Sequence, residues 1–408
     1  MPEYKGLAYL QQRLMLKRIR VDLRYKYYEM KNVTRDFGIS TPPDLRYFMG
    51  CLGWCGKAVD SLADRLQFRE FGDDYFDLNQ IYNLNNKDIL IDSAILAALI
   101  SSCSFIYISK DESGFPRLQV IDGGNATGIM DPITEMLSEG YAVLERDDLG
   151  MPLLEAYFLP GRTYYYRAGR LVDVRESASP YPLLVPVINR PDARRPFGHS
   201  RISRACMSIV GSALRTVKRS EIAAEFFSYP QKYVTGLAEN AERMDKWKAT
   251  MSSMITFTKD EDGDHPILGQ FQQESMTPHL EQLRMFAALF AGETGLTLDD
   301  LGFATENPSS SEAIKAQHEN LRLTARKAQR TFGTALLNAG YLAACVRDDQ
   351  PYLRRQLYLT KPKWEPVFEP DAAGLSSIGD GAIKVNQAVP GYFTADTLHD
   401  FTGIAPGI

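Results

Sequence analysis

The spacing of apolar positions changes character along the chain. Residues 4–31 alternate Leu with Arg and Lys at the 3.6-residue spacing of an amphipathic helix, and helical spacing returns at residues 44–66 and 84–102. From Cys103 the spacing becomes that of strands. The β-rich runs lie between turn signals, at 105–109, 118–122, 141–145, 154–159, 163–167 and 171–175. This region predicts a mostly antiparallel sheet.

A second half begins after a proline-rich connector. A strong helical pattern covers residues 200–227 and ends at Tyr229-Pro230, because the residue before a proline disfavours the helical conformation. A small α/β insert follows, with strands expected at 232–235, 254–258 and 267–271 and a short helix at 238–248. Thr277 and Pro278 then open another helix, which stops at Gly295.

The longest predicted helix follows an irregular loop. Residues 296–308 show no regular period, and a capping box of Ser309 and Glu312 starts a helix that runs to about residue 346. Lys315, Arg322, Arg326 and Arg330 are spaced 7, 4 and 4 residues apart, which places them on one face. A stripe of this kind is either a solvated face or a surface for an anionic partner.

The length and composition of the chain indicate its number of domains and its fold class. With 408 residues, 44% of them hydrophobic, the chain should form more than one domain, and the pattern of elements indicates an α+β fold. No apolar run is long enough for a membrane span and no secretory cleavage site follows the start, so we expect no membrane contact and a location in a cytoplasm or a particle built there. The five cysteines should be reduced, with Cys51 and Cys55 as small buried hydrophobes.

The charge balance limits how nucleic acid could be bound. The formal net charge is −5, whereas tight binders of nucleic acid carry basic surfaces that neutralise phosphates. Such a chain should bind DNA only weakly. It is compatible with a channel through which DNA slides without sequence preference.

Catalytic and metal-binding patterns are missing from the sequence. The five histidines occur in no HExxH or HxH setting, and no GxSxG motif is present. The cluster at residues 260–264 with His265 resembles a divalent-metal site most, but a calcium loop would need Gly and Glu where His265 and Phe271 stand. We therefore expect no catalytic residues, no metal and no cofactor, and a protein that is not an enzyme.

Several short segments, in order, resemble the portal proteins of tailed bacteriophages with long non-contractile tails. No single segment is specific, but their order and their positions on the predicted elements match that family over most of the chain. The segments are Val187-Ile-Asn-Arg-Pro191, Phe197-Gly-His-Ser-Arg-Ile202, Glu225-Phe-Phe-Ser-Tyr-Pro-Gln231, Leu298-Asp-Asp-Leu-Gly-Phe303 and Asn307-Pro-Ser-Ser-Ser-Glu-Ala-Ile314.

The resemblance implies a portal-type architecture. A mixed α/β wing would take up residues 1–199, and two stem helices would flank a small α/β clip. The implied parts are the stem helix 200–227, the clip 228–276, the stem helix 277–294, the tunnel loop 295–310, the long tunnel-to-wing helix 311–346, and a C-terminal wing and short crown region 347–408.

The resemblance also implies a function. A ring of about twelve copies at one capsid vertex would conduct double-stranded DNA during packaging and ejection. Implied partners are further copies of this chain, non-specifically held DNA, the terminase large subunit, the major capsid and scaffold proteins, and a head-completion or adaptor protein. The chain would reside in the virion, after assembly in the host cytoplasm.

Candidate contact residues follow from these assignments. The tunnel loop would present Thr305, Glu306 and Asn307 to DNA, and Lys315 and Arg322 would form basic rings or pair with acidic groups of neighbouring subunits. In the clip, the residues expected to contact protein partners are Tyr229, Trp247 and Asp262.

Two alternatives share parts of this pattern. Another structural ring protein of the virion would also lack catalytic motifs, although it should be smaller and without the order of stem, clip and stem. A metal-dependent nuclease would depend on Asp260, Asp262, Asp264 and His265.

Overall fold

The computed structural model describes residues 4–35, 50–228, 232–235, 267–270, 275–303 and 316–404. Helices account for 48% and strands for 20%, so the prediction of an α+β protein is confirmed. Two compact units are present, one formed by Met1–Asn32, Gly53–Met207 and Thr294–Ile408 and the other by Val33–Leu52 and Ser208–Glu293. In the described ranges no helix is both long and apolar enough to cross a lipid bilayer.

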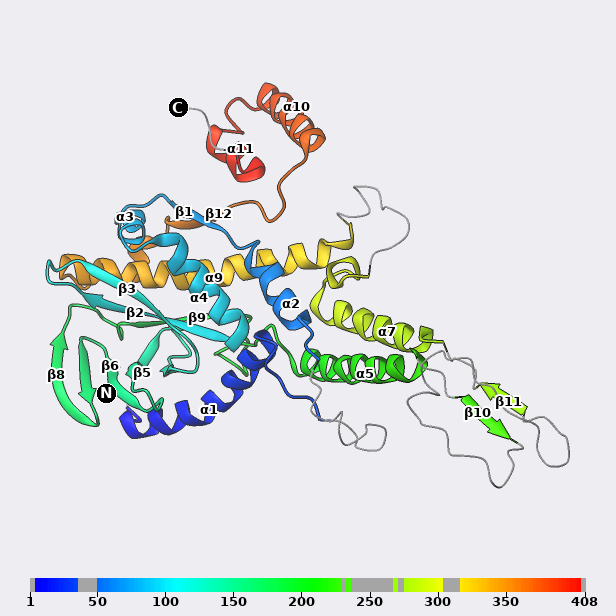
Figure 1. The fold of residues 1–408 in the computed structure, drawn as a ribbon. Coiled ribbons are helices and arrows are strands. Elements are labelled where there is room, and N and C mark those ends of the chain that lie inside the picture. Colours follow the sequence, from blue (N-terminus) through cyan, green and yellow to red (C-terminus); the bar gives the residue numbers. More distant parts are fainter. Residues whose placement is uncertain are drawn as a thin grey trace, which may run out of the picture. The chain divides into compact units, whose positions relative to one another are not determined.

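The larger unit contains a five-stranded antiparallel sheet in which chain neighbours are also spatial neighbours (Figure 1). Its strands are β4 (Ala126–Met130), β5 (Leu137–Arg146), β6 (Pro152–Leu159), β7 (Arg162–Arg167) and β8 (Arg170–Glu176). Side chains alternate between the two faces along each strand. The strands predicted at 141–145, 154–159, 163–167 and 171–175 are confirmed as β5 to β8.

Helix α1 (Leu7–Tyr28) covers one face of this sheet. Leu10 and Leu14 are buried against Tyr141, Val143 and Tyr157 of β5 and β6. Burial of side chains of this size contributes about 1.5–3 kcal/mol each. The inward face of the helix predicted over 4–31 therefore stabilises its packing on the sheet.

A three-stranded antiparallel sheet, in the order β3-β2-β9, forms the centre of the same unit. It consists of β2 (Cys103–Lys110), β3 (Pro116–Ile121) and β9 (Leu184–Ile188). Ring contacts of Tyr107 with Phe158, at 5.4 Å between centroids, join it to the five-stranded sheet. Helix α4 (Lys87–Ser101) packs on it, and the Ser104 hydroxyl donates a 2.6 Å hydrogen bond to the Ala94 carbonyl oxygen.

The longest helix, α9 (Glu319–Asp348), also packs against this small sheet. Its C-terminal half is almost wholly buried, and the Tyr82 hydroxyl donates a 2.7 Å hydrogen bond to the Leu336 carbonyl oxygen. Strand β12 (Lys361–Trp364) pairs antiparallel with β1 (Phe68–Gly72) and passes directly over α9. A Cβ on Gly333 would lie 2.6 Å from Pro362 Cγ, so only glycine permits this approach.

The remaining helices of the larger unit are short. They include α2 (Trp54–Ala63), α3 (Leu78–Asn83) and the C-terminal pair α10 (Ala372–Ala388) and α11 (Ala395–Thr402), together with the 3-10 turns η2 (Asp299–Leu301) and η3 (Arg354–Leu357). An ion pair of 2.7 Å between Arg69 and Asp400 ties α11 to β1. The helix ends are capped by Asp371 and Thr394 side chains.

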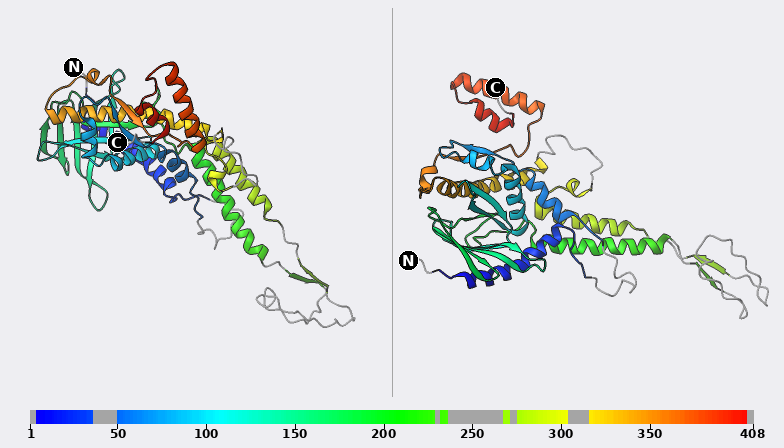
Figure 2. Two further views of the ribbon diagram at one scale, coloured as in Figure 1. Left: turned by 90° about the horizontal axis from the view of Figure 1, so that it is seen from above. Right: turned by 60° about the vertical axis from the view of Figure 1, so that its left-hand side comes forward.

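The smaller unit contains two long antiparallel helices and a strand pair. Helices α5 (Arg204–Ser228) and α7 (Thr277–Thr294) lie side by side (Figures 1 and 2), with a 3.0 Å hydrogen bond from the Thr216 hydroxyl to Gln282 Oε1. Strand β10 (Lys232–Thr235) pairs antiparallel with β11 (Ile267–Gln270). The helices predicted over 200–227 and from Thr277 are therefore confirmed.

Some predicted elements differ from the observed ones, although the helix predicted over 84–102 is confirmed as α4, which begins at Lys87 after Asn86 in a left-handed conformation. The helix predicted over 44–66 begins only at Trp54, so the preceding Cys51 is exposed and not buried like Cys55. Strand β9 was expected to be an extended connector. Pro186 lies within it, which is tolerated because β9 is an edge strand.

Candidate functional site

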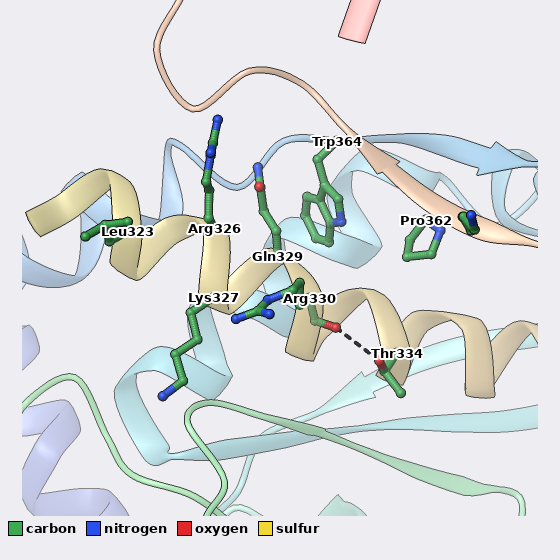
Figure 3. A pocket seen from close by; sticks show the side chains of 9 residues that line it. Leu323, Arg326, Lys327, Gln329, Arg330, Thr334, Pro362 and Trp364 are labelled. Atoms are coloured by element: carbon green, nitrogen blue, oxygen red, sulfur yellow. Dashed lines mark hydrogen bonds between the residues drawn. The ribbon is translucent and has the colours of Figure 1, made fainter. Parts of the chain in front are cut away.

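An open groove of about 730 Å³ runs along the N-terminal half of α9 (Figure 3). One side is the exposed face of α9 and the other is β12. Its lining residues are Leu323, Arg326, Lys327, Gln329, Arg330, Thr334, Lys361, Pro362 and Trp364.

The helical repeat explains which α9 residues line the groove. Leu323, Lys327, Arg330 and Thr334 follow one another at intervals of four, three and four residues and share one face, which the adjacent Arg326 borders. The opposite face carries Leu321, Ala325, Ala328 and Phe332, which are buried. The core thus fixes the rotation of α9 and turns its cations outward.

Four cationic side chains concentrate at this groove. Arg326, Lys327 and Arg330 project from α9 and Lys361 from β12, and none of the four forms an ion pair with a carboxylate in the part of the chain that the structure describes. The neighbouring carboxylates Glu319 and Glu365 pair with other residues. Like charges repel one another at this spacing, so the groove favours an anionic occupant.

The floor of the groove combines apolar surface with a free hydrogen-bond donor. Leu323, Pro362 and Trp364 supply the apolar atoms. The indole nitrogen Nε1 of Trp364 is buried and has no hydrogen-bond partner among the described residues. A buried donor without a partner costs free energy in the folded chain.

Arg322 lies outside this groove and its charge is compensated. Its Nε and Nη2 donate hydrogen bonds of 2.6 Å each to the two carboxylate oxygens of Glu319. This bidentate pair lowers the pKa of Glu319 and raises that of Arg322, and the mutual hydrogen bonds are the main cause of both shifts. Arg322 therefore offers an external anion less free charge than Arg326 or Arg330.

The other residues that the sequence singles out cannot be placed. Thr305, Glu306, Asn307 and Lys315 of the loop and helix start lie outside the described residues, as do Tyr229, Trp247 and Asp262 of the insert. Their roles remain predictions. Within the described ranges, no three His, Cys, Asp or Glu side chains are grouped as a metal site requires.

The basic stripe predicted from the sequence contains two of the four cationic residues of the groove. The spacing of the basic stripe predicted that Arg326 and Arg330 share a face with one another, but Lys327, Lys361 and Trp364 were not recognised. Lys361 and Trp364 reach the groove only through the pairing of β12 with β1, a contact between residues far apart in the chain. No local pattern contains that information.

The two units define a large α+β protein, in which α9 and β12 carry a groove with four cationic side chains. Two curated proteins are similar to this chain over most of its length. The portal protein of Mycobacterium phage L5 is 24% identical over 392 residues, which cover 89% of this chain and 80% of the relative. The portal protein of Mycobacterium phage D29 is 25% identical over 394 residues, with the same coverage. The resemblance to phage portal proteins is confirmed by these relatives, and neither is named for a catalytic activity.

No protein-family model matches the chain, and the similar solved structures share little sequence with it. A chain from the virion of a native gene transfer agent particle is 13% identical, with a TM-score of 0.47 and coverage of 95% of this chain and 100% of that chain. A chain from the neck of the empty particle, computed with C6 symmetry, is also 13% identical, with a TM-score of 0.48 and coverage of 93% and 98%.

Proposed function

We propose that this chain is the subunit of a portal ring through which double-stranded DNA enters and leaves a phage capsid. The observation that carries the proposal is the similarity to two portal proteins along 89% of the chain. A ring of about twelve copies at one capsid vertex repeats each side chain around the axis, so DNA is guided without base-specific contacts.

The proposed parts follow the order of the elements. Residues 1–199 form the wing, α5 and α7 the stem, and residues 228–276 the clip, in which β10 pairs with β11. Residues 295–310 form the tunnel loop, residues 311–346 the helix that leads from the tunnel to the wing, and residues 347–408 a C-terminal wing and short crown. The side-by-side packing of α5 and α7 supports the stem assignment.

The DNA contacts should be weak. In this proposal Thr305, Glu306 and Asn307 approach the duplex, and Lys315 forms a basic ring. Arg322 contributes less than its charge suggests, because Glu319 holds its guanidinium. With a net charge of −5, the chain suits a channel in which DNA moves without strong binding.

The partners are those that a packaging vertex needs. In the clip, Tyr229, Trp247 and Asp262 contact the terminase large subunit during packaging and a head-completion protein afterwards. The wing contacts the major capsid and scaffold proteins. The ring assembles in the host cytoplasm and remains in the virion, and it needs no cofactor.

A packaging assay separates this function from the nuclease alternative. Capsids assembled without the chain should contain no DNA, and capsids assembled with the wild-type chain should package it. Asp262→Ala should form normal rings but package less DNA, because it removes one proposed contact with the terminase large subunit. In the same assay the purified ring should not hydrolyse DNA with Mg²⁺ or Mn²⁺. Metal-dependent cleavage that Asp262→Ala abolishes, with assembly intact, would instead identify a nuclease.

A further inference from the structure

A second charged surface of the larger unit complements the basic groove. Asp88 and Asp92 stand one turn apart on the exposed side of α4, and Ile89 between them is 72% exposed. Asp64, at the C-terminus of α2, adds a third carboxylate. Lys87 is the one described cation paired with this group, at 3.7 Å from Asp88. We define these residues, Asp64, Asp88, Ile89 and Asp92, as the acidic face.

The carboxylates of the acidic face disfavour one another within a single copy. The pKa of Asp92 is raised, first by burial and then by the charges of Asp88 and Asp64. Like charges one helical turn apart are destabilising in water. A cationic surface placed against them would relieve this repulsion.

The groove and the acidic face are carried by different elements of the larger unit. The groove lies on α9 and β12, whereas the acidic face lies on α4 and the C-terminus of α2. Among the described residues no ion pair joins the two surfaces within one copy, and the cation paired with the acidic face is Lys87. Two copies placed side by side in the same orientation can bring the two surfaces together.

We propose that the basic groove of one copy binds the acidic face of α4 of the next copy, with Asp88 and Asp92 between the four groove cations and Ile89 on the apolar floor. This inference rests on the proposed ring. A closed ring of identical subunits needs two different, complementary surfaces on each subunit. An exposed aliphatic side chain flanked by two carboxylates matches a groove with an apolar floor and cationic edges.

The apolar floor favours a protein partner over DNA. A phosphate backbone would satisfy Arg326, Lys327, Arg330 and Lys361, but it has nothing apolar to place on Leu323, Pro362 and Trp364. The acidic face supplies both kinds of surface. Complementary charges at an interface also fix which surfaces meet and in which register.

A charge swap tests the contact. Arg326→Glu/Arg330→Glu and Asp88→Lys/Asp92→Lys should each raise the concentration for half-assembly at least about tenfold, because like charges then meet at the interface. The protein that carries all four substitutions should recover most of the wild-type assembly, as measured by native mass and sedimentation.

Two control variants change the charge equally at exposed sites outside both surfaces and should leave assembly unchanged. They are Arg167→Glu/Arg170→Glu and Glu112→Lys/Asp148→Lys. Each variant is compared with the wild type by thermal unfolding to confirm that it folds.

Disulfide trapping tests the same contact independently of ring closure. In a Cys51→Ser background, Ile89→Cys/Leu323→Cys should form a ladder of covalent multimers on oxidation, since a disulfide needs Cα atoms about 4.4–6.8 Å apart. Each single cysteine variant should remain monomeric on a denaturing gel. A double variant without multimers would contradict the inference.

The outcomes separate this inference from the proposed function. Rings that persist in both charge variants would overturn the inference and leave the portal function intact. Rings that persist in Arg326→Glu/Arg330→Glu but fail to package DNA would show that the groove contacts DNA instead. A wild type that never forms rings, even with capsid and scaffold proteins, would count against the portal function itself.

Discussion

At the scale of single residues, two buried carboxylates hold the N-terminal helix on the sheet. Glu139, which is 1% exposed, accepts hydrogen bonds from the backbone nitrogens of Lys5 and Gly6, at 2.8 and 3.1 Å, and from the Tyr157 hydroxyl at 2.9 Å. Glu155 accepts hydrogen bonds from Gln11 and the Tyr141 hydroxyl. Burial, and next the hydrogen bond to Glu139, raise the pKa of Tyr157.

The sequence does not predict the role of Glu139, which lies before the strand predicted over 141–145. In the structure Glu139 belongs to β5 and shares its inward face with Leu137, Tyr141 and Val143, two residues apart. A buried carboxylate at this position needs hydrogen-bond donors, and the chain that enters α1 supplies them. The backbone groups of Lys5 and Gly6 are 134 and 133 residues away in the chain, so no local pattern reveals the contact.

Replacement of Glu139 should release the start of α1. Glu139→Ala leaves two backbone donors and the Tyr157 hydroxyl without their acceptor, which should lower the free energy of unfolding by about 2–4 kcal/mol. Hydrogen exchange of residues 5–10 should become faster. Glu145→Ala is the matched control, since Glu145 is on the same strand and exposed, and it should change stability by less than about 0.5 kcal/mol. Equal protection of α1 in both variants would contradict this role.

At the scale of elements, periodic segments were predictable, and the proline-containing strands β9 and β12 were not. The period-2 runs that became β5 to β8 and the helical pattern that became α9 each carry their own signal. Strands β9 and β12 contain Pro186 and Pro362, and proline in a short run argues against a strand. Both are edge strands, where a missing backbone donor costs little.

The close approach of β12 to α9 can be tested with glycine substitutions of opposite sign. Gly333→Ala would gain about 1 kcal/mol of helix propensity, but its Cβ would meet Pro362, so the net effect should be a loss of about 1–3 kcal/mol. Gly379→Ala in α10 meets nothing within 4 Å and should stabilise the helix. Denaturant unfolding measures both. A stabilising Gly333→Ala would show that β12 does not pack on α9 as described.

At the scale of the whole molecule, short ordered segments were more informative than composition. Two of these segments meet at a tight loop before α5, where the Asn189 amide donates a 2.7 Å hydrogen bond to the His199 carbonyl oxygen and the His199 nitrogen donates one of 2.8 Å to Asn189. Gly198 has a φ of +68°, and a Cβ there would lie 2.1 Å from the Asn189 carbonyl oxygen. Residues of the two segments therefore shape the backbone at this loop.

The interfaces between copies could not be predicted in the same way. A single sequence shows that a face is basic or acidic, but which faces meet depends on the fold of each copy and on the symmetry of the assembly. The groove combines residues of α9 and β12, and its proposed counterpart lies on other elements, α4 and the C-terminus of α2. Only the folded chain shows that the two surfaces are complementary.

The central claim is tested most directly by the mass and shape of the assembled protein. Native mass measurement followed by averaged electron images should show a closed ring of about twelve subunits of 45.9 kDa, with an axial hole wider than the roughly 20 Å of a DNA duplex, whose major groove alone is about 12 Å wide. A protein that stays monomeric or dimeric, alone and in the presence of capsid and scaffold proteins, would contradict the account.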